Sequence, residues 1–242
     1  MSRDISPDVQ TIKLFLTEPH TCSYLKDKKA TTAFVDPNVD IDPHLYTELS
    51  DMGFRRSGRY IYAPRCDGCR ACIPARLLVN EFRPNRQQRR CNKRNKDLSV
   101  WVTSKINESE HYPLYARYIT KRHADGDMYP PNRAQFKDFI SHLWLNSKMI
   151  EVRERGELIA AGVVDILDNG LSAIYTYYST NKEHNYRSLG TFTLLAEIML
   201  AKHMKLPHVY LGYWIKDSPK MAYKSNYQPL EILSKGEWVP VD

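Results

Sequence analysis

Residues 148–178 of the chain have the sequence KMIEVRERGELIAAGVVDILDNGLSAIYTYY. Two short turn sequences, Arg155-Gly156 and Asp168-Asn169-Gly170, divide this stretch into three segments rich in β-branched and aromatic residues. Each turn is typical of a hairpin, in which two consecutive strands pair directly. The predicted strands are Lys148–Glu154, Glu157–Leu167 and Gly170–Tyr178.

Helices and single strands are expected on both sides of these three strands. Upstream, we predict a strand at Leu98–Thr103 and helices at Glu108–His123 and Asn132–Asn146. Downstream, apolar residues repeat at helical spacing over Ser188–Met204. The remaining predicted elements are a strand at His208–Gly212, a short helix near Lys220–Lys224 and a last strand near Leu230–Leu233. The order β-α-α-β-β-β-α-β-α-β is that of the GNAT acyltransferase fold, so the predicted fold class is α/β (mixed α+β).

The first 90 residues differ from the rest, because frequent prolines break them into short pieces. Asp42-Pro43 is typical of a helix start, and this helix is expected to end at Met52, before Gly53. We therefore predict two domains: a smaller cysteine-bearing N-terminal domain at residues 1–97 and a GNAT-like domain at residues 98–242. The strands expected in the N-terminal part are Ile12–Leu16, Thr32–Val35, Phe54–Tyr62 and Arg76–Phe82.

The chain has 242 residues, of which 42% are hydrophobic and 26% are charged. These ordinary globular values exclude a wholly disordered chain, a collagen-like fibre and a disulfide-dense miniprotein. No apolar run approaches the roughly 18 residues of a membrane span, and the first residues lack the apolar stretch of a signal peptide. The protein is therefore expected to be soluble and cytoplasmic, with no membrane partner.

The formal net charge of +7 arises from one segment. Between Phe82 and Lys96 there are basic but no acidic residues, and the rest of the chain balances its charges. If the segment is helical from about Asn85, like charges share one face, and an anionic partner such as folded RNA would neutralise them. A solvated surface helix is the alternative. The candidate RNA-binding residues are Arg86, Arg89, Arg90, Lys93 and Arg94.

Three cysteines follow one another closely in Cys66-Asp-Gly-Cys69-Arg-Ala-Cys72. In an intracellular protein this spacing favours a zinc ion or an iron–sulfur cluster rather than disulfides. Cys22 is the candidate fourth ligand, with His20 as a substitute. The alternative is that all four thiols are small buried residues of a reduced protein. A catalytic thiol is disfavoured, because no signature of a partner base accompanies it.

The C-terminal half carries aromatic residues near the ends of its predicted strands, among them Tyr178, Tyr213 and Trp214. Such side chains suit a pocket wall, although sheet packing explains some of them. At the start of the long helix, free backbone amides favour a phosphate, and Gly190 permits close approach. Only Arg187 and Gly190 match the glycine-rich loop of GNAT acetyltransferases, which argues against acetyl-CoA as the donor.

Cations follow the last of these aromatic segments. Lys220 and Lys224 lie four residues apart on the short predicted helix and are suited to bind a carboxylate. A solvated helix is the alternative. Asp217, just before them, is either a base or the N-cap of that helix.

Several segments together resemble one family, the aminoacyl-tRNA–protein transferases of the arginyltransferase type. The segments span about residues 12–235 in the order typical of that family, and they are most similar to its bacterial branch, the aspartate/glutamate leucyltransferases. They are Cys22-Ser-Tyr-Leu, Phe54-Arg-Arg-Ser-Gly, Tyr62-Ala-Pro-Arg-Cys-Asp-Gly-Cys-Arg-Ala-Cys-Ile-Pro-Ala-Arg, Arg86-Gln-Gln-Arg-Arg with Lys93-Arg-Asn-Lys-Asp-Leu, Arg187-Ser-Leu-Gly-Thr and Tyr210-Leu-Gly-Tyr-Trp-Ile with Lys220-Met-Ala-Tyr-Lys.

The resemblance implies transfer of leucine from leucyl-tRNA to the α-amine of proteins with N-terminal Asp or Glu. This would mark those proteins for proteolysis through the N-degron pathway. Aminolysis of an ester needs positioning more than a covalent intermediate, so no cofactor is required for the chemistry. The preference for leucine over arginine rests on the resemblance alone, and no stable protein partner is inferred.

Roles for individual residues are hypotheses that follow from this resemblance. Asp217, Tyr178 and Tyr223 are the candidate catalytic residues, as base or proton relay. The candidate substrate-binding residues fall into three groups: Arg187 and Gly190 for the terminal tRNA phosphates, Tyr213 and Trp214 with Tyr178 as pocket walls, and Lys220 and Lys224, or Arg76, for the acceptor carboxylate. The candidate metal ligands are Cys22, Cys66, Cys69 and Cys72.

Three other functions are compatible with parts of the sequence. An arginyl-tRNA–protein transferase of the same family would differ only in its donor. A GNAT N-acetyltransferase would bind acetyl-CoA and should carry a fuller glycine loop. A non-enzymatic RNA-binding zinc protein would bind RNA without acyl transfer, so that changes at Lys220 or Tyr223 would have no effect.

Overall fold

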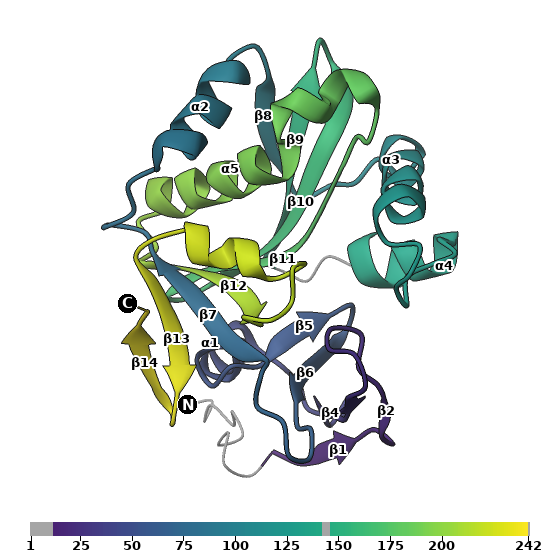
Figure 1. Cartoon of the computed structure of the whole chain (residues 1–242), viewed down its shortest axis with the longest axis vertical. Helices are drawn as coiled ribbons and strands as arrows, with labels where there is room; N and C mark the ends of the chain where they lie inside the picture. Colours follow the sequence, from purple (N-terminus) through teal and green to yellow (C-terminus); the bar gives the residue numbers. More distant parts are fainter. Residues whose placement is uncertain (1–11, 142–145, 242) are drawn as a thin grey trace, which may run out of the picture.

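The computed structural model describes residues 12–141 and 146–241, and these contain one large and two smaller sheets. The large sheet has the strand order β14-β13-β7-β12-β11-β10-β9-β8 (Figure 1). β9, β10 and β11 pair antiparallel in succession, which confirms the two hairpins predicted within residues 148–178. The strands are β7 (Ile73–Leu78), β8 (Ser99–Thr103), β9 (Ser147–Glu154), β10 (Glu157–Leu167), β11 (Gly170–Tyr178), β12 (His208–Trp214), β13 (Leu230–Ser234) and β14 (Glu237–Pro240).

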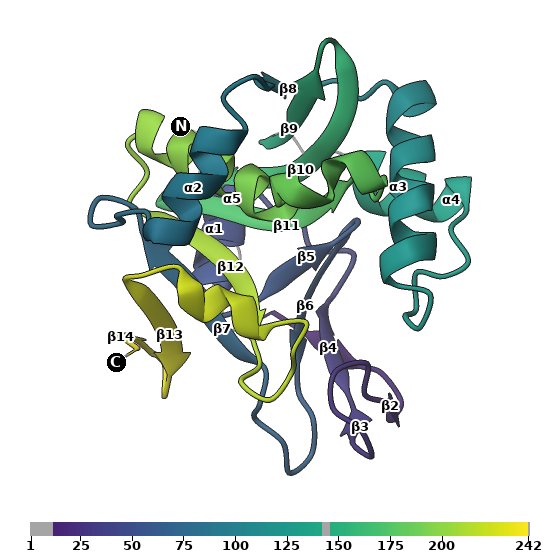
Figure 2. The same ribbon diagram turned by 45° about the horizontal axis from the view of Figure 1, so that its top comes forward.

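Helices cover both faces of the large sheet. Successive residues of a strand point to opposite faces, so Val163 of β10 packs with α3 (Glu108–Arg122) and Val164 packs with α5 (Leu189–His203). The helix α2 (Arg86–Arg94) lies against α5, as Figures 1 and 2 show. The architecture is therefore the mixed α/β fold that the order of elements predicts.

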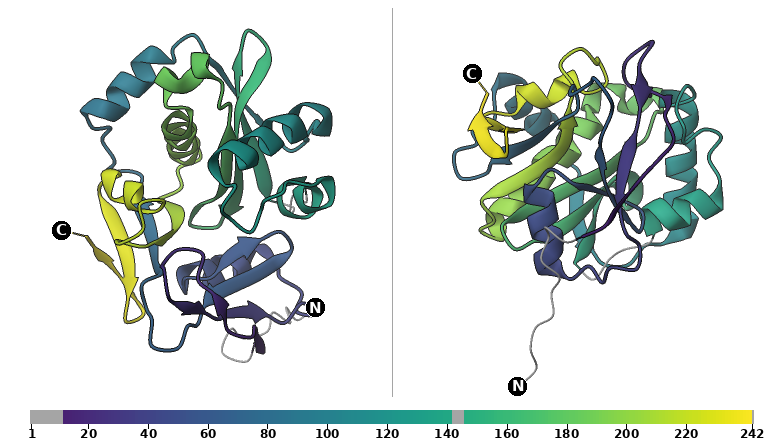
Figure 3. Two further views of the ribbon diagram at one scale, coloured as in Figure 1. Left: turned by 45° about the vertical axis from the view of Figure 1, so that its right-hand side comes forward. Right: turned by 90° about the horizontal axis from the view of Figure 1, so that it is seen from below.

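A smaller sheet lies below the large one (Figure 3). Its order is β1-β4-β6-β5, from β1 (Leu14–Leu16), β4 (Thr32–Val35), β5 (Arg55–Ser57) and β6 (Tyr60–Pro64). As predicted, Asp42 caps the accompanying helix α1 (Pro43–Asp51), where its carboxylate accepts from Leu45 N at 2.7 Å. A two-stranded sheet, β2 (His20–Thr21) with β3 (Lys29–Ala30), was not predicted.

The predicted domain boundary at residue 97 does not coincide with the division between the sheets. β7 lies in the N-terminal part of the chain, yet it pairs with β12 and β13 inside the large sheet. The helix α2, also before residue 97, packs on α5. The large sheet is therefore built from both parts of the chain.

Several predicted elements differ in detail. The segment Phe54–Tyr62, predicted as one strand, is the hairpin β5–β6, because Gly58 turns the chain with a φ of 58°. The strand predicted at Arg76–Phe82 is β7, which starts earlier and ends at Leu78. The helix predicted at Asn132–Asn146 is α4 (Arg133–Phe136) and a π-helical turn, η2 (Lys137–Ser141); residues 142–145 lie outside the described residues.

Shorter helices complete the described structure. The helix predicted near Lys220–Lys224 is the 3₁₀-helix η4 (Ala222–Asn226), and a further 3₁₀-helix, η3 (Lys182–Arg187), precedes α5. None of the helices in residues 12–141 and 146–241 has the length and apolarity that crossing a membrane would require.

The parallel strands β11 and β12 pair over only part of their length. Their partners run from Gly170 with His208 to Ser172 with Tyr210. Directly beyond, the pairing of β12 with β7 is irregular, and Gly212 adopts a φ of 78°. The C-terminal halves of β11 and β12 therefore carry backbone groups that side chains must satisfy.

Candidate functional site

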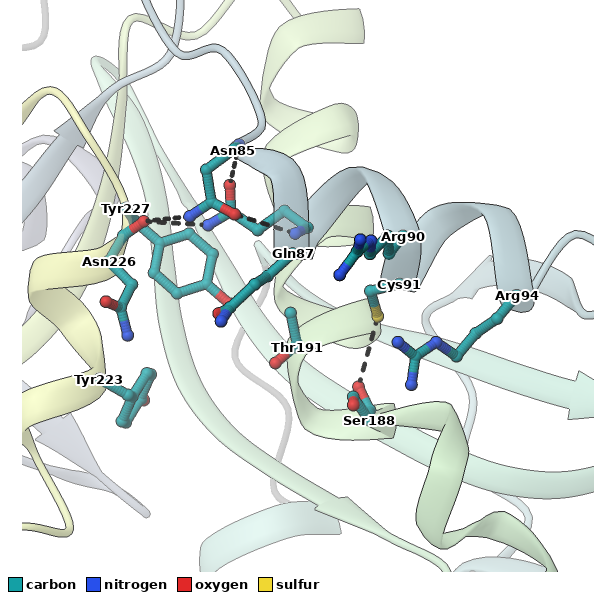
Figure 4. Close-up of a pocket in the computed structure, with 11 residues that line it drawn as sticks. Asn85, Gln87, Arg90, Cys91, Arg94, Ser188, Thr191, Tyr223, Asn226 and Tyr227 are labelled. Carbon is teal, nitrogen blue, oxygen red and sulfur yellow. Dashed lines mark hydrogen bonds between the residues drawn. The ribbon is translucent and has the colours of Figure 1, made fainter.

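A cleft of about 360 Å³ lies between α2, the first residues of α5 and η4 (Figure 4). Polar and aromatic side chains from these three segments face one another across it. The cleft is lined by Asn85, Gln87, Gln88, Arg90, Cys91 and Arg94 from α2 and its cap, by Ser188 and Thr191 from α5, and by Tyr223, Asn226 and Tyr227 from η4 and the residue after it. Because these segments are far apart in the sequence, only the fold brings them together.

The start of α2 is fixed by its own sequence. The side chain of Asn85 accepts from Gln88 N at 3.0 Å, and Gln88 Oε1 accepts from Asn85 N at 2.8 Å, which is a capping box. Both side chains also donate to the carbonyl of Asn226, so that the helix start is held against η4.

The basic residues of α2 are available to an anion. The five candidate RNA-binding residues, Arg86, Arg89, Arg90, Lys93 and Arg94, are exposed, and none of them forms an ion pair with a described acidic residue. Two of them, Arg90 and Arg94, line the cleft. The structure therefore brings part of the predicted basic patch to the same place as the start of α5.

The N-terminus of α5 has no side-chain cap. Ser188 occupies the N-cap position with a φ of 54° and makes no capping hydrogen bond. The first amides of the helix therefore lack intrahelical partners and can bind an anion. The helix start also borders a second cleft, which Tyr178 and Gly190 line together. A Cβ atom at Gly190 would lie 2.9 Å from Tyr178 Cε1, so the glycine permits this contact.

Three charged residues are buried near Tyr223, which lines the cleft, although they do not line it themselves. Arg55 of β5 is 7% exposed, Lys224 of η4 is 5% exposed and Glu197 of α5 is 1% exposed. Burial raises the pKa of Glu197 to about 8, against a lowering by Thr176 and Arg55. Burial, together with the charge of Arg55, lowers the pKa of Lys224 to about 7. Of the three, only Lys224 was predicted as a functional residue.

Comparison with known families agrees with this architecture. The model of the arginine-tRNA-protein transferase N terminus matches residues 20–90, and the model of the C terminus matches residues 110–234. The chain is a member of the arginine-tRNA-protein transferase family. An aspartate/glutamate leucyltransferase of Saccharophagus degradans is 49% identical over 96% of this chain and 98% of its own length. One from Pseudomonas fluorescens is also 49% identical, over 96% of this chain and 98% of its own.

Solved structures show the fold of this transferase but not its chemistry. The structure of L-PGS from Bacillus licheniformis aligns with a TM-score of 0.50 and 12% identity, over 95% of this chain and 82% of its own. A conserved protein of unknown function from Bacteroides thetaiotaomicron aligns with a TM-score of 0.51 and 13% identity, over 69% of this chain and 61% of its own.

Arg187 of the transferase is engaged by neighbouring carboxylates. It is 5% exposed, its Nη2 donates to Asp97 Oδ2 at 2.7 Å, and it also pairs with Glu154. The guanidinium thus links the residues after α2 to β9 and does not line either cleft. Its predicted role in binding tRNA phosphates stays a prediction, while Gly190 lies where the phosphate hypothesis requires.

The predicted pocket aromatics occupy different places. Tyr223 lines the cleft, with 48% of its surface exposed, and Tyr178 lines the second cleft beside Gly190. Tyr213, by contrast, points to the smaller sheet, where its hydroxyl donates to the carbonyl of Gly53 at 2.9 Å. Trp214 packs against the core that contains α5. Sequence reasoning missed Thr191 and the η4 contacts of α2, because nothing local in the sequence signals them.

The other candidate cations are paired away from the cleft. Arg76 is bound by Asp51 at 3.2 Å and Glu231 at 2.7 Å, and it stacks on Trp238. Lys220 pairs with Asp125 at 2.7 Å on the surface. Asp217 is exposed and does not cap η4, whose N-cap is Met221, so the N-cap alternative is wrong.

The four candidate metal ligands lie near one another. Burial and then the neighbouring thiols of Cys66, Cys22 and Cys69 raise the pKa of Cys72 to about 11. All four are free and partly exposed. However, within residues 12–141 and 146–241 no three His, Cys, Asp or Glu side chains converge closely enough to hold a metal ion. Zinc or an iron–sulfur cluster at these cysteines therefore stays a prediction.

Proposed function

We propose that this protein transfers leucine from leucyl-tRNA to the α-amine of proteins that begin with Asp or Glu. The observation that carries the proposal is the cleft in which unpaired cations of α2 face the uncapped start of α5. Relatives named aspartate/glutamate leucyltransferase, 49% identical over nearly the whole chain, support the choice of donor and acceptor. The added leucine is proposed to mark the acceptor for proteolysis by the N-degron pathway in the cytoplasm.

The acceptor end of the tRNA would lie along α2 and end at α5. Arg90 and Arg94 line the cleft and would hold phosphates, since guanidinium groups bind phosphate oxygens in pairs. The free amides beside Gly190 suit the last phosphate, and the exposed ring of Tyr223 offers a stacking surface for the terminal adenine. These contacts recognise backbone and shape rather than base sequence.

The reaction in this proposal is the aminolysis of an ester. The neutral α-amine attacks the carbonyl carbon that joins leucine to the ribose; the new C–N bond forms and the C–O bond to the ribose breaks. The ribose oxygen receives the proton that the amine loses. Positioning and stabilisation of the oxyanion carry most of the catalysis, with Tyr223 in the cleft as the candidate proton relay.

A transfer assay tests the proposal. Purified protein is mixed with leucyl-tRNA or arginyl-tRNA and with peptides that begin with Asp, Glu, Lys or Ala, and the products are weighed by mass spectrometry. A leucine mass added only to the Asp and Glu peptides is the expected result. Addition of arginine instead would contradict leucyl-tRNA as the donor, while the transfer of an amino acid from tRNA to the peptide would still be confirmed. No addition from either charged tRNA would overturn the proposal.

A further inference from the structure

Arg55 fills the gap where β11 and β12 separate. It comes from β5 of the smaller sheet, and its Nη1 donates to Ser172 Oγ on β11 at 2.8 Å. Its Nη2 donates to the carbonyl of Ala173, the first residue of β11 beyond the pairing with β12. On the other side, a Cβ atom at Gly212 of β12 would lie 3.4 Å from Arg55 Nε. A buried cation therefore stands between the two strands.

Lys224 lies in the same region and is bound to the other strand. Its Nζ donates to the carbonyl of Tyr213, in the part of β12 that does not pair with β11. Its neighbours include Arg55, whose charge disfavours the ammonium form. Two buried cations are thus held on either side of one gap by neutral carbonyl and hydroxyl groups.

Neither cation has a carboxylate partner among the described residues. The other buried arginines do: Arg56 pairs with Asp165, and Arg187 pairs with Asp97 and Glu154. Buried charges of like sign are costly unless an anion neutralises them, and uncompensated charges of this kind occur at binding sites. An anion bound between them would therefore stabilise Arg55 and the ammonium form of Lys224.

Glu197 adds an acid to the same cluster. Its Oε1 lies 3.5 Å from Thr176 Oγ1, and its Oε2 has no hydrogen-bond partner in the part of the chain that the structure describes. Gly162 of β10 makes room for the carboxyl group, because a Cβ atom there would lie 2.5 Å from Oε1. Tyr223, which lines the cleft, interacts electrostatically with both Glu197 and Arg55. The cluster is thus adjacent to the cleft proposed to hold the ester.

Resting on the proposed function, we propose that Arg55 and Lys224 bind the side-chain carboxylate of the acceptor's first residue, while Glu197 accepts a hydrogen bond from its α-amine. The cluster is complementary to such a residue: two cations for the carboxylate and one acid for the amine. Asn or Gln at the same position would leave both cations unpaired, so acidic residues are selected over neutral residues of nearly equal shape.

The test compares two acceptor peptides that differ only in Asp or Asn at the first position. The kcat/KM for leucine transfer is measured for the wild type, for Lys224→Met and for the control Lys216→Met. Lys216 is an exposed cation in the segment between β12 and η4. Lys224→Met is expected to lower kcat/KM for the Asp peptide about 30-fold, as loss of a buried charge partner does, and to change the Asn peptide little. The control should retain the wild-type preference.

A second variant separates recognition from folding. Arg55→Lys keeps the charge but loses donors, and it should raise KM for the Asp peptide while kcat changes little. An equal loss on both peptides in Lys224→Met, or an unchanged ratio of Asp to Asn, would overturn the inference. In either case leucine transfer by the wild type would leave the proposed function standing. Absence of transfer by the wild type would instead overturn that function.

Discussion

Glu197 makes stability depend on pH through a single buried carboxyl group. Its pKa is about 8 in the folded protein, against 4.5 for an ordinary Glu, and the groups around it are Thr176, Arg55, Tyr223 and Tyr227. Between these values the folded state holds a proton that the unfolded state has lost. The contribution of the protonated Glu197 to the free energy of unfolding is therefore full below about pH 4.5 and falls as pH rises through about 8.

Replacing this acid by its amide should remove that dependence. Glu197→Gln keeps the shape of the side chain but cannot ionise, so the wild type should lose roughly 1 kcal/mol per pH unit relative to the variant between pH 5 and 8. Denaturant unfolding of both proteins at several pH values measures the difference. A difference that stays constant with pH would show that Glu197 does not titrate in this range.

Gly190 is expected to matter for activity more than for stability. In Gly190→Ala the new Cβ atom would meet the ring of Tyr178 at 2.9 Å, so the ring must move away from the start of α5. Alanine favours a helix over glycine by about 0.5–1 kcal/mol, which offsets part of the strain.

Transfer kinetics and thermal melting test this expectation together. We expect kcat/KM for leucine transfer to fall about tenfold, while the melting temperature changes by only a few degrees. Lys202→Ala, at the exposed far end of the same helix, is the control. Unchanged transfer in Gly190→Ala would exclude a close approach of substrate to this part of α5.

Sequence reasoning identified residues whose chemistry is local. The run of cations in α2 and Gly190 at the start of α5 are visible in the sequence, and both lie at the clefts. Arg55 and Glu197 could not be found this way, because a charged residue in a strand or helix gives no sign that it is buried. The orientation of Tyr213 could not be inferred for the same reason: the register of β12 directs its hydroxyl to the carbonyl of Gly53.

The helix α2 is expected to bind tRNA through its charge alone. The variant Arg90→Gln with Arg94→Gln removes two cations that line the cleft. Each lost phosphate contact should reduce the slope of log K against log salt by roughly 0.7–0.9, so the double variant should lose about 1.5 from the slope. Filter binding of leucyl-tRNA across roughly 50–200 mM salt measures it.

A matched charge change elsewhere completes this test. Lys105→Gln with Lys202→Gln removes the same net charge from exposed positions outside both clefts. This control should bind tRNA with nearly the wild-type slope. If both double variants lose the same slope, attraction by the overall net charge, rather than contact with α2, explains the binding.

The elements that were predicted well have strong signals at their ends. The turns at Arg155-Gly156 and Asp168-Asn169-Gly170, the cap at Asp42 and the polar start of α2 all lie where the sequence indicates. The hairpin β5–β6 was missed because its turn, Gly58, adapts the chain to a tertiary neighbour: a Cβ atom there would lie 2.8 Å from the carbonyl oxygen of Asp138. A contact of that kind cannot be inferred from local sequence.

At the scale of the whole molecule, the two sheets are joined by the chain and by buried charge. β7 carries the chain from the smaller sheet into the large one. Long-range strand order of this kind is not determined by hydrophobic pattern, so the sequence does not indicate that β7 belongs to the large sheet. The division of the chain into domains at residue 97 stays a prediction. The contact between the two sheets also positions Arg55. The two parts of the chain must therefore fold together to complete the acceptor site.

The buried ion pair Arg56–Asp165 is the strongest candidate for the contact that joins the two sheets. Asp165 of β10 accepts from Arg56 Nε at 2.6 Å, from Tyr46 of α1 at 2.7 Å and from Ser147 at 2.5 Å. The side chains of Arg56 and Asp165 are 0% and 1% exposed. Removing one partner of a buried pair leaves the other charge uncompensated, which typically costs about 3–5 kcal/mol.

Asp165→Asn should therefore destabilise the whole protein, whereas Asp138→Asn should not. Asp138 pairs with Arg59 at 3.7 Å, but both side chains are mostly exposed, so the loss should stay within about 1 kcal/mol. Unfolding by urea, followed by far-UV circular dichroism and by tryptophan fluorescence, measures both variants. Because this contact couples the two sheets, the two probes should report one unfolding transition in the wild type. In Asp165→Asn both probes should report the same, lower urea midpoint. Separate transitions in the variant would show that the sheets fold independently. Equal losses of stability in Asp165→Asn and Asp138→Asn would exclude the buried pair as the contact that joins the sheets.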